Sequence, residues 1–145
     1  MGARDTQRSR VYAWEDRVIA PRDASQVAFA AAQGMVDAIW SEMGLHHPPR
    51  VERLPAQART RIADANRLTL RLPASTPSWC LLHELAHAMT TTHDGRSDGH
   101  GPGFVGIYVQ LLGRYLRLEQ DWLLRTLTEA GIRVRTDARP VFIDP

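Results

Sequence analysis

The sequence predicts an α+β fold, and three observations lead to this prediction. Apolar residues recur at helical spacing in four segments, at 24–43, 77–91, 102–115 and 119–130. Between the first two of these segments lie short stretches bounded by turn residues, as strands are. The order of helix, strands and then helices is typical of an α+β fold with a small antiparallel or mixed sheet. We expect the first helix to pack on that sheet.

The first 43 residues are assigned as an arm, a strand-like stretch and a helix. Residues 1–10 are charged and are predicted to be a flexible N-terminal arm, with one domain over 11–145. Residues 10–14, "RVYAW", have the composition of a strand. Asp23 and Gln26 form a predicted capping box at the start of the first helix. Gly44 follows the helical pattern and is expected to end it.

Strands are predicted for the middle of the chain. Residues 50–54 read as one strand, and "RTRIA" and "RLTLRL" read as two arms of a hairpin around the turn "DAN" at 64–66. In the second arm Leu68, Leu70 and Leu72 would share one face, which predicts a half-buried strand.

The C-terminal half is predicted to be helical. A helix over 77–91 is followed by a loop rich in Gly and Asp at 92–101. Pro102 suits the first turn of the next helix, because proline has no amide hydrogen to leave unbonded there. Gly131 is expected to end the last helix, and "IRV" is expected to form a final short strand.

Composition excludes several classes of protein. The chain of 145 residues is 43% hydrophobic and 23% charged, as soluble domains are, and contains no apolar run as long as a membrane span. The charged N-terminus is not followed by the apolar core of a signal peptide, so we expect a cytoplasmic protein without a membrane partner. A single cysteine, Cys80, excludes an internal disulfide framework and a cysteine-rich zinc ribbon.

Basic residues are concentrated in one stretch. All 18 basic residues are arginine, and the formal net charge is only +2. Residues 50–72 hold six of them against two acids. The cluster is either a solvated sheet surface or a basic face for an acidic partner such as nucleic acid. Its members are Arg50, Arg53, Arg59, Arg61, Arg67 and Arg71.

The predicted helix over 77–91 contains the pattern H-E-x-x-H. His83 and His87 are one helical turn apart, so both imidazoles leave the same face and can bind one metal ion, most simply zinc. Glu84 projects about 100° away around the helix axis. Its carboxylate would lie near the metal without binding it and could take a proton from a water molecule there.

A catalytic zinc site needs a third protein ligand. His93 has the spacing of the third histidine in H-E-x-x-H-x-x-G-x-x-H, where the glycine lets the chain leave the helix sharply. That position is Thr90 here, and a β-branched residue resists positive φ. The sharp exit that would bring His93 to the metal is therefore not expected.

His100 is the preferred third ligand. It lies between two glycines, which allow close approach of the backbone, and just before the helix that Pro102 opens. A carboxylate from Glu119 or Asp121 stays open as an alternative. Candidates for stabilising a transition-state oxyanion lie on the helix over 102–115, and packing accounts for its tyrosines equally well: Tyr108, Arg114 and Tyr115.

The stretch "LLHELAHAMTTTHDGRSDGHGPGF" resembles the active-site segment of SprT-like metallopeptidases. The resemblance covers about residues 59–117. Residues 4–15, "RDTQRSRVYAWE", are similar to the N-terminal segment of small metallohydrolases from bacteria and phages. The resemblance implies a zincin-like fold with His83, His87 and His100 as zinc ligands and Glu84 as general base.

Two functions follow from these patterns. The first is a zinc-dependent metallopeptidase that acts on a peptide or protein substrate through metal-activated water. The second is a non-catalytic binding or regulatory module that a metal stabilises and that could be associated with nucleic acid. A structural site usually closes with four protein ligands, and it has no use for a base at Glu84, which favours the enzyme.

Overall fold

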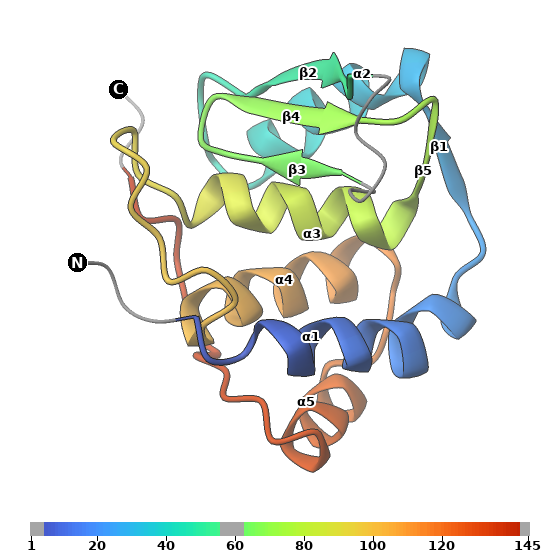
Figure 1. The fold of residues 1–145 in the computed structure, drawn as a ribbon, viewed down its shortest axis with the longest axis vertical. Helices are drawn as coiled ribbons and strands as arrows, with labels where there is room; N and C mark the ends of the chain where they lie inside the picture. The colour runs from blue at the N-terminus through green and yellow to red at the C-terminus, as the bar shows by residue number, and fades with distance from the viewer. Residues whose placement is uncertain (1–4, 56–62, 143–145) are drawn as a thin grey trace.

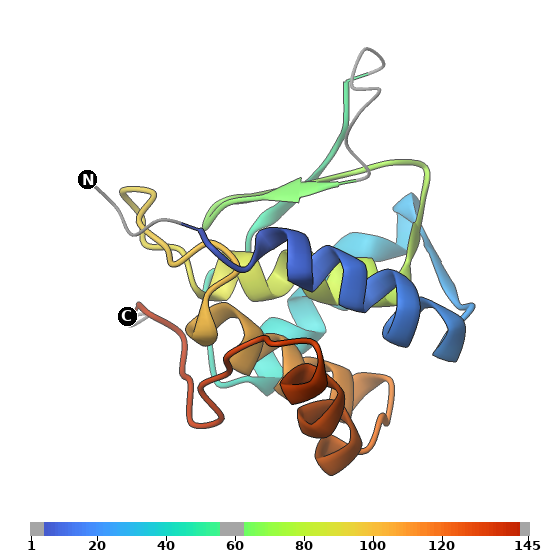
Figure 2. The same cartoon turned by 60° about the horizontal axis from the view of Figure 1, so that its bottom comes forward.

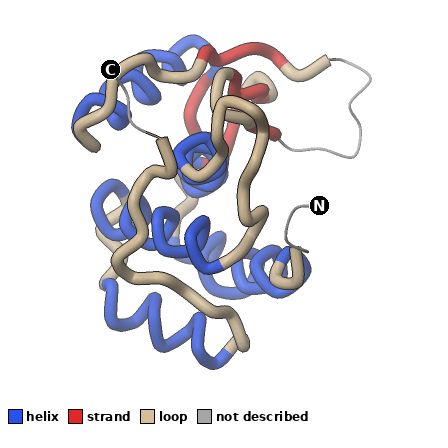
Figure 3. Tube along the Cα trace, turned by 90° about the vertical axis from the view of Figure 1, so that its left-hand side faces the viewer, coloured by secondary structure: helices blue, strands red, loops and turns tan. Residues whose placement is uncertain are grey.

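The computed structural model describes residues 5–55 and 63–142, and these form an α+β fold as predicted. The helix over 29–42 packs on a small mixed sheet. The helix that carries H-E-x-x-H and the helix after His100 follow it in the chain. Figure 3 shows the strands gathered at one end of the molecule. In the described part of the chain no helix has both the length and the apolar character needed to cross a membrane.

The chain begins with helical turns rather than with a strand. Helix α1 (Arg8–Trp14) continues as a π-helical turn (Glu15–Ile19) and a 3₁₀ turn (Ala20–Arg22). The strand-like interpretation of 10–14 is therefore wrong. Val11 and Trp14 are both buried, and this spacing of three places them on one face of a helix. Of the predicted arm, residues 1–4 lie outside the described residues, and Gln7 is 1% exposed.

The first long helix begins later than predicted. Asp23 accepts a hydrogen bond from the Ser25 hydroxyl, and Gln26 opens strand β1 (Gln26–Ala28), so the predicted capping box is wrong. Strand β1 pairs antiparallel with β5 (Ser75–Pro77), and helix α2 (Phe29–Glu42) follows it. Gly44 has a φ of 80° just after α2, as expected for a helix end.

The main sheet has the strand order β2-β4-β3. Strand β2 (Arg50–Arg53) runs parallel to β4 (Thr69–Leu72), and β3 (Asp64–Ala65) is antiparallel to β4. The predicted turn at 64–66 is displaced, because the first two of its residues form β3. The turn follows at Asn66, whose side-chain oxygen accepts hydrogen bonds from the backbone amides of Leu68 and Thr69. Most of the predicted first hairpin arm, at 59–63, lies outside the described residues.

The alternation of buried and exposed residues that is predicted for 67–72 holds only within β4. Leu70 and Leu72 are fully buried, as predicted, but Leu68 precedes the strand and is 58% exposed. Arg67 is buried instead, with its guanidinium over the rings of Trp40 and Phe142 at 4.8 and 4.2 Å. Arg67 is therefore a core residue and not part of an exposed basic face.

The helices of the C-terminal half lie where the sequence predicts them. They are α3 (Ser78–Met89), α4 (Pro102–Tyr115) and α5 (Gln120–Glu129). The predicted strand at 132–134 is wrong, since no strand follows α5 within the described residues. Helix α3 lies between the sheet and α4 (Figure 1), with α1 alongside them in the second view (Figure 2). Accordingly, every residue of α3 except Trp79 and His87 is buried.

The segment after α5 crosses closely over α4 at Gly106. A Cβ atom at this position would lie 1.9 Å from the carbonyl oxygen of Arg135 and 2.8 Å from the Cβ of Ala138. The backbone amide of Arg135 also donates to the carbonyl of Pro102. Only glycine leaves room for this crossing.

Gly106→Ala is expected to lower the free energy of unfolding by roughly 1–3 kcal/mol or more, because backbone atoms must move apart. Gly34→Ala is the matched control. Gly34 is exposed in α2 with nothing within 4 Å of an added Cβ, so alanine there should stabilise by about 0.5–1 kcal/mol. Urea titration of both variants measures the difference. Equal stability of the two variants would mean that the segment does not pack on α4 as described.

Candidate metal centre

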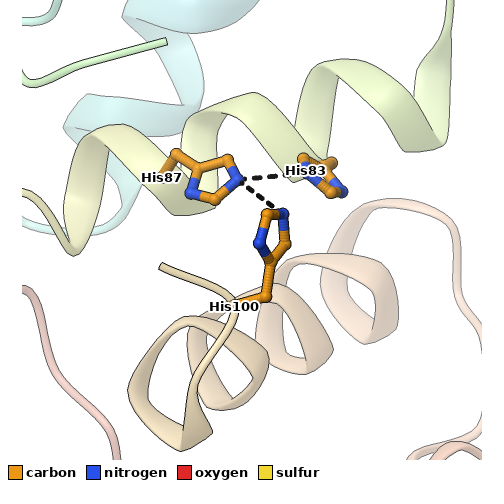
Figure 4. A group of neighbouring side chains, drawn as sticks. All are labelled: His83, His87 and His100. Atoms are coloured by element: carbon orange, nitrogen blue, oxygen red, sulfur yellow. Dashed lines mark hydrogen bonds between the residues drawn. The ribbon is translucent and has the colours of Figure 1, made fainter. Parts of the chain in front are cut away.

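Helix α3 brings His83 and His87 together on one face. The two Nε2 atoms are 3.1 Å apart, as the one-turn spacing predicts (Figure 4). His83 is 4% exposed, and His87 is half-buried and lines a cleft. The helix that carries both histidines is held on two sides by the sheet and by α4, so their backbone positions are fixed by packing.

The loop before α4 supplies the third histidine. Gly99 has a φ of 64°, which favours glycine, and a Cβ there would lie 2.6 Å from the carboxylate of Asp5 and displace it. The carboxylate of Asp98 accepts hydrogen bonds from the backbone amides of Gly103 and Phe104 in the first turn of α4. His100 is thereby placed with its Nε2 atom 3.2 Å from that of His87 (Figure 4).

The three imidazoles form a group that can hold a metal ion. Their ligand atoms all lie within 4.8 Å of one another. Ligands of a tetrahedral zinc ion, at about 2.0–2.1 Å from the metal, are roughly 3.3 Å apart, close to the two shorter separations seen here. The histidines and their spacing therefore fit a zinc ion, and imidazole also suits several other transition metals.

The alternatives to His100 lie elsewhere. His93 is exposed, and its ring lies 6.4 Å from that of Phe142. Thr90 ends α3 with a φ of −110°, and its hydroxyl donates to the carbonyl of Ala86, so the chain leaves the helix without the sharp turn. Among the described residues, the group that can hold an ion includes neither Glu119 nor Asp121.

Burial keeps the histidines in the form that binds metals. Burial and, to a smaller extent, the nearby imidazole of His100 together lower the pKa of His83 to about 3. Burial likewise lowers the pKa of His87 well below its usual value. Both side chains are therefore neutral near pH 7, and a neutral imidazole offers a lone pair to a metal.

Two carboxylates from the N-terminal segment hold the outer nitrogens of two of these histidines. Glu15 Oε2 lies 2.5 Å from His83 Nδ1, and Asp5 Oδ2 lies 2.8 Å from His100 Nδ1. With a proton on each Nδ1 atom, both Nε2 atoms present lone pairs to the shared point. Sequence reasoning missed both carboxylates. For Glu15 a signal existed, because a helical pattern over 8–15 places it on the same apolar face as Val11 and Trp14.

A cleft of about 560 Å³ opens beside the histidines. Glu84 lines it and is 6% exposed. Burial, with smaller contributions from the charges of Glu15 and Asp64, raises the pKa of Glu84 to about 8. A cation at the three histidines would act in the opposite direction and favour the carboxylate. The other walls come from α1 and the π-helical turn after it, from β3 and from the start of α3, and include Tyr12, Asp16, Ala65 and Trp79.

The tyrosines that the sequence offered for transition-state stabilisation are engaged elsewhere. Tyr108 is fully buried and donates its hydroxyl hydrogen bond to Glu15, and Tyr115 donates to Glu42. Arg114 lies by Tyr115, with its guanidinium 5.7 Å from that ring. The tyrosine that lines the cleft is Tyr12 of α1, which is 41% exposed and stacks 5.9 Å from the ring of His83. The assignment of 10–14 as a strand hid this position.

Helix α3 thus places Glu84, His83 and His87 at one cleft, and the loop before α4 brings His100 to the two histidines. Comparisons of the chain with protein-family models, with curated proteins and with solved structures found no match. The geometry itself therefore carries the conclusion that His83, His87 and His100 form a buried group able to hold a metal ion.

Proposed function

We propose that the protein is a zinc-dependent hydrolase, and specifically a metallopeptidase in which His83, His87 and His100 bind the metal and Glu84 is the general base. The observation that carries this proposal is the convergence of three Nε2 atoms beside an open cleft that Glu84 also lines. The SprT-like resemblance of residues 81–104 supports the same assignment.

The chemistry follows from the positions of these groups. Zinc held by the histidines would polarise the substrate carbonyl and make a water molecule a better nucleophile. Glu84 takes the proton from that water and delivers it to the leaving amine. Burial favours the protonated form of Glu84 that exists between these two transfers, and the charge of the metal would favour the carboxylate that begins and ends them. The cleft beside His87 leaves space for the substrate.

The substrate we propose is a peptide or protein segment in an extended conformation. Such a segment would not pair with β4, because β4 lies between β2 and β3 in the sheet. The edge that lines the cleft is β3, at Asp64 and Ala65. An extended substrate segment would pair its backbone amides with β3 and so pass the metal centre.

The three-ligand set favours an enzyme over the metal-stabilised binding module. A structural zinc site normally has four protein ligands, whereas the described group has three. The structure also gives little support to the hypothesis that the basic cluster binds nucleic acid. Arg67 is buried and Arg71 pairs with Asp64 at 2.5 Å, while Arg59 and Arg61 lie outside the described residues.

Removal of the metal is expected to abolish hydrolysis of a mixed peptide library, and addition of about one zinc ion per chain should restore it. The measurement is mass spectrometry of the peptides before chelation, after dialysis against a chelator, and after reloading. Circular dichroism of the metal-free sample controls for loss of fold. Cleavage that persists in metal-free protein would contradict the proposal, and so would a zinc-loaded protein that cleaves no peptide or protein substrate.

A further inference from the structure

Glu15 is a buried carboxylate that joins the helices of the candidate metal centre. It is 2% exposed, at the first residue of the π-helical turn that follows α1. Its Oε2 atom lies 2.5 Å from Nδ1 of His83 on α3 and accepts a 2.7 Å hydrogen bond from the hydroxyl of Tyr108 on α4. One oxygen atom is therefore held from two sides by two different helices.

Packing alone does not account for an acid at this position. A buried carboxylate costs several kcal/mol unless hydrogen bonds and charges compensate it. Part of its surroundings is aromatic: the preceding residue, Trp14, is 1% exposed, and its ring lies 6.1 Å from that of the fully buried Tyr108. An apolar residue would fill the same space at lower cost. The geometry of Glu15 is explained if its role is to hold His83.

We propose that Glu15 is a positioning residue of the metal centre, which fixes the ring and the protonated nitrogen of His83, and that Tyr108 in turn fixes Glu15. This inference rests on the proposed metal binding. The bond at Nδ1 directs Nε2 of His83 toward the point that it shares with His87 and His100. Tyr108 removes the freedom of the Glu15 carboxylate to rotate away.

The same N-terminal segment also supports His100, but less rigidly. Asp5 contacts Nδ1 of His100 with a side chain that is 29% exposed. Gln7 is buried, and its amide donates to the carbonyl of His100 and to that of Arg133. Residues 5–15 are thus a structural part of the metal centre. Glu15 is the strongest point of contact, since water competes less for a buried bond.

The test compares Glu15→Gln with Asp16→Asn. Each removes one carboxylate on the same turn, but Asp16 is exposed, and the carboxylate in contact with Nδ1 of His83 is that of Glu15. Zinc affinity is measured by competition with a chromophoric chelator. We expect Glu15→Gln to bind zinc about 10- to 100-fold more weakly, as for other residues that hold a ligand histidine. Asp16→Asn should stay within about twofold of wild type, since an exposed charge is screened.

Tyr108→Phe supplies an independent variant that leaves the carboxylate in place. Loss of its hydrogen bond should weaken zinc binding by about 3- to 10-fold. The double variant with Glu15→Gln should be no weaker than Glu15→Gln alone, because Tyr108 acts through Glu15. If Glu15→Gln fails to fold, Tyr108→Phe decides: an unchanged affinity overturns the inference, and a loss supports it.

A spectroscopic signature separates positioning from general stability. In zinc-loaded protein labelled with ¹⁵N-histidine, the Nδ1–H proton of His83 should resonate far downfield because of its short bond to a carboxylate, and Glu15→Gln should move it upfield. Asp16→Asn should leave it unmoved.

The outcomes also distinguish this inference from the proposed function. Wild-type protein that binds no zinc overturns both. Zinc binding that depends on His83 but is equal in Glu15→Gln and Asp16→Asn overturns the positioning role of Glu15 alone.

Discussion

Glu84→Gln is expected to reduce hydrolytic turnover by at least about 10²–10⁴-fold while the fold and the zinc content are kept. The amide has nearly the shape of the carboxylate, but it neither accepts a proton from water nor returns one to the leaving amine. Glu84 is not among the three residues whose ligand atoms converge, so its replacement should leave the metal ligands intact. Turnover of the zinc-loaded variant and wild type on the same peptide library measures the effect.

The pH dependence of stability tests whether Glu84 is buried, because only a buried carboxylate has the raised pKa that Glu84→Gln removes. Without metal, burial raises the pKa of Glu84 to about 8, above its value of about 4.5 in the unfolded chain. The folded state then binds the proton more tightly, so this group contributes stability at low pH that is lost as the pH rises from about 4.5 to 8. Glutamine does not titrate. The melting temperature of the metal-free variant, relative to wild type, should therefore be higher at pH 9 than at pH 5.

Equal turnover of Glu84→Gln and wild type would assign the observed cleavage to another residue or to a contaminant. A variant that has lost zinc as well as activity would instead make Glu84 part of the ligand set. The zinc content of each preparation, measured beside the turnover, separates these results.

The patterns that predicted structure well were those with strong local chemistry. In α3, the pair His83 and His87 and the apolar stripe around them both require helical spacing, and the structure agrees. Thr90 predicts that the chain does not turn sharply toward His93 after α3, and the glycines beside His100 predict its close approach; the structure agrees with both. Pro102 and the surrounding glycines predicted where α4 begins.

The patterns that failed were those in which tertiary contacts override local preference. "RVYAW" has β-forming residues, but Val11 and Trp14 find buried partners only as one face of a helix, with the Trp14 indole donating to Thr126 in α5. Arg67 alternates as an outward residue, yet two aromatic rings far away in the sequence cover it. Glu15 and Asp5 were missed for the same reason, since each meets its histidine across more than sixty residues of chain.

His87→Ala is expected to reduce zinc affinity by at least about 100-fold. Structural zinc sites in peptides are worth about 10–16 kcal/mol over four ligands, so one ligand contributes a few kcal/mol. His87 is the most informative of the three positions, because its Nε2 atom is within 3.2 Å of both other Nε2 atoms. It is also half-buried, so alanine there disturbs packing less than at His83, where Glu15 would lose its partner in the core.

His93→Ala is the matched control, since it removes a histidine from the same stretch of chain without touching the cluster. Metal analysis of purified protein should find about one zinc per chain in wild type and in His93→Ala. His87→Ala, His83→Ala and His100→Ala should each lose most of it. Full zinc retention in both His83→Ala and His87→Ala would remove the metal assignment altogether. Loss in His93→Ala with retention in His100→Ala would mean that the chain turns sharply after α3 and that residues 90–100 are arranged differently. Loss confined to the three clustered histidines would leave the fourth coordination position for water or substrate, which a hydrolase needs and a structural site does not.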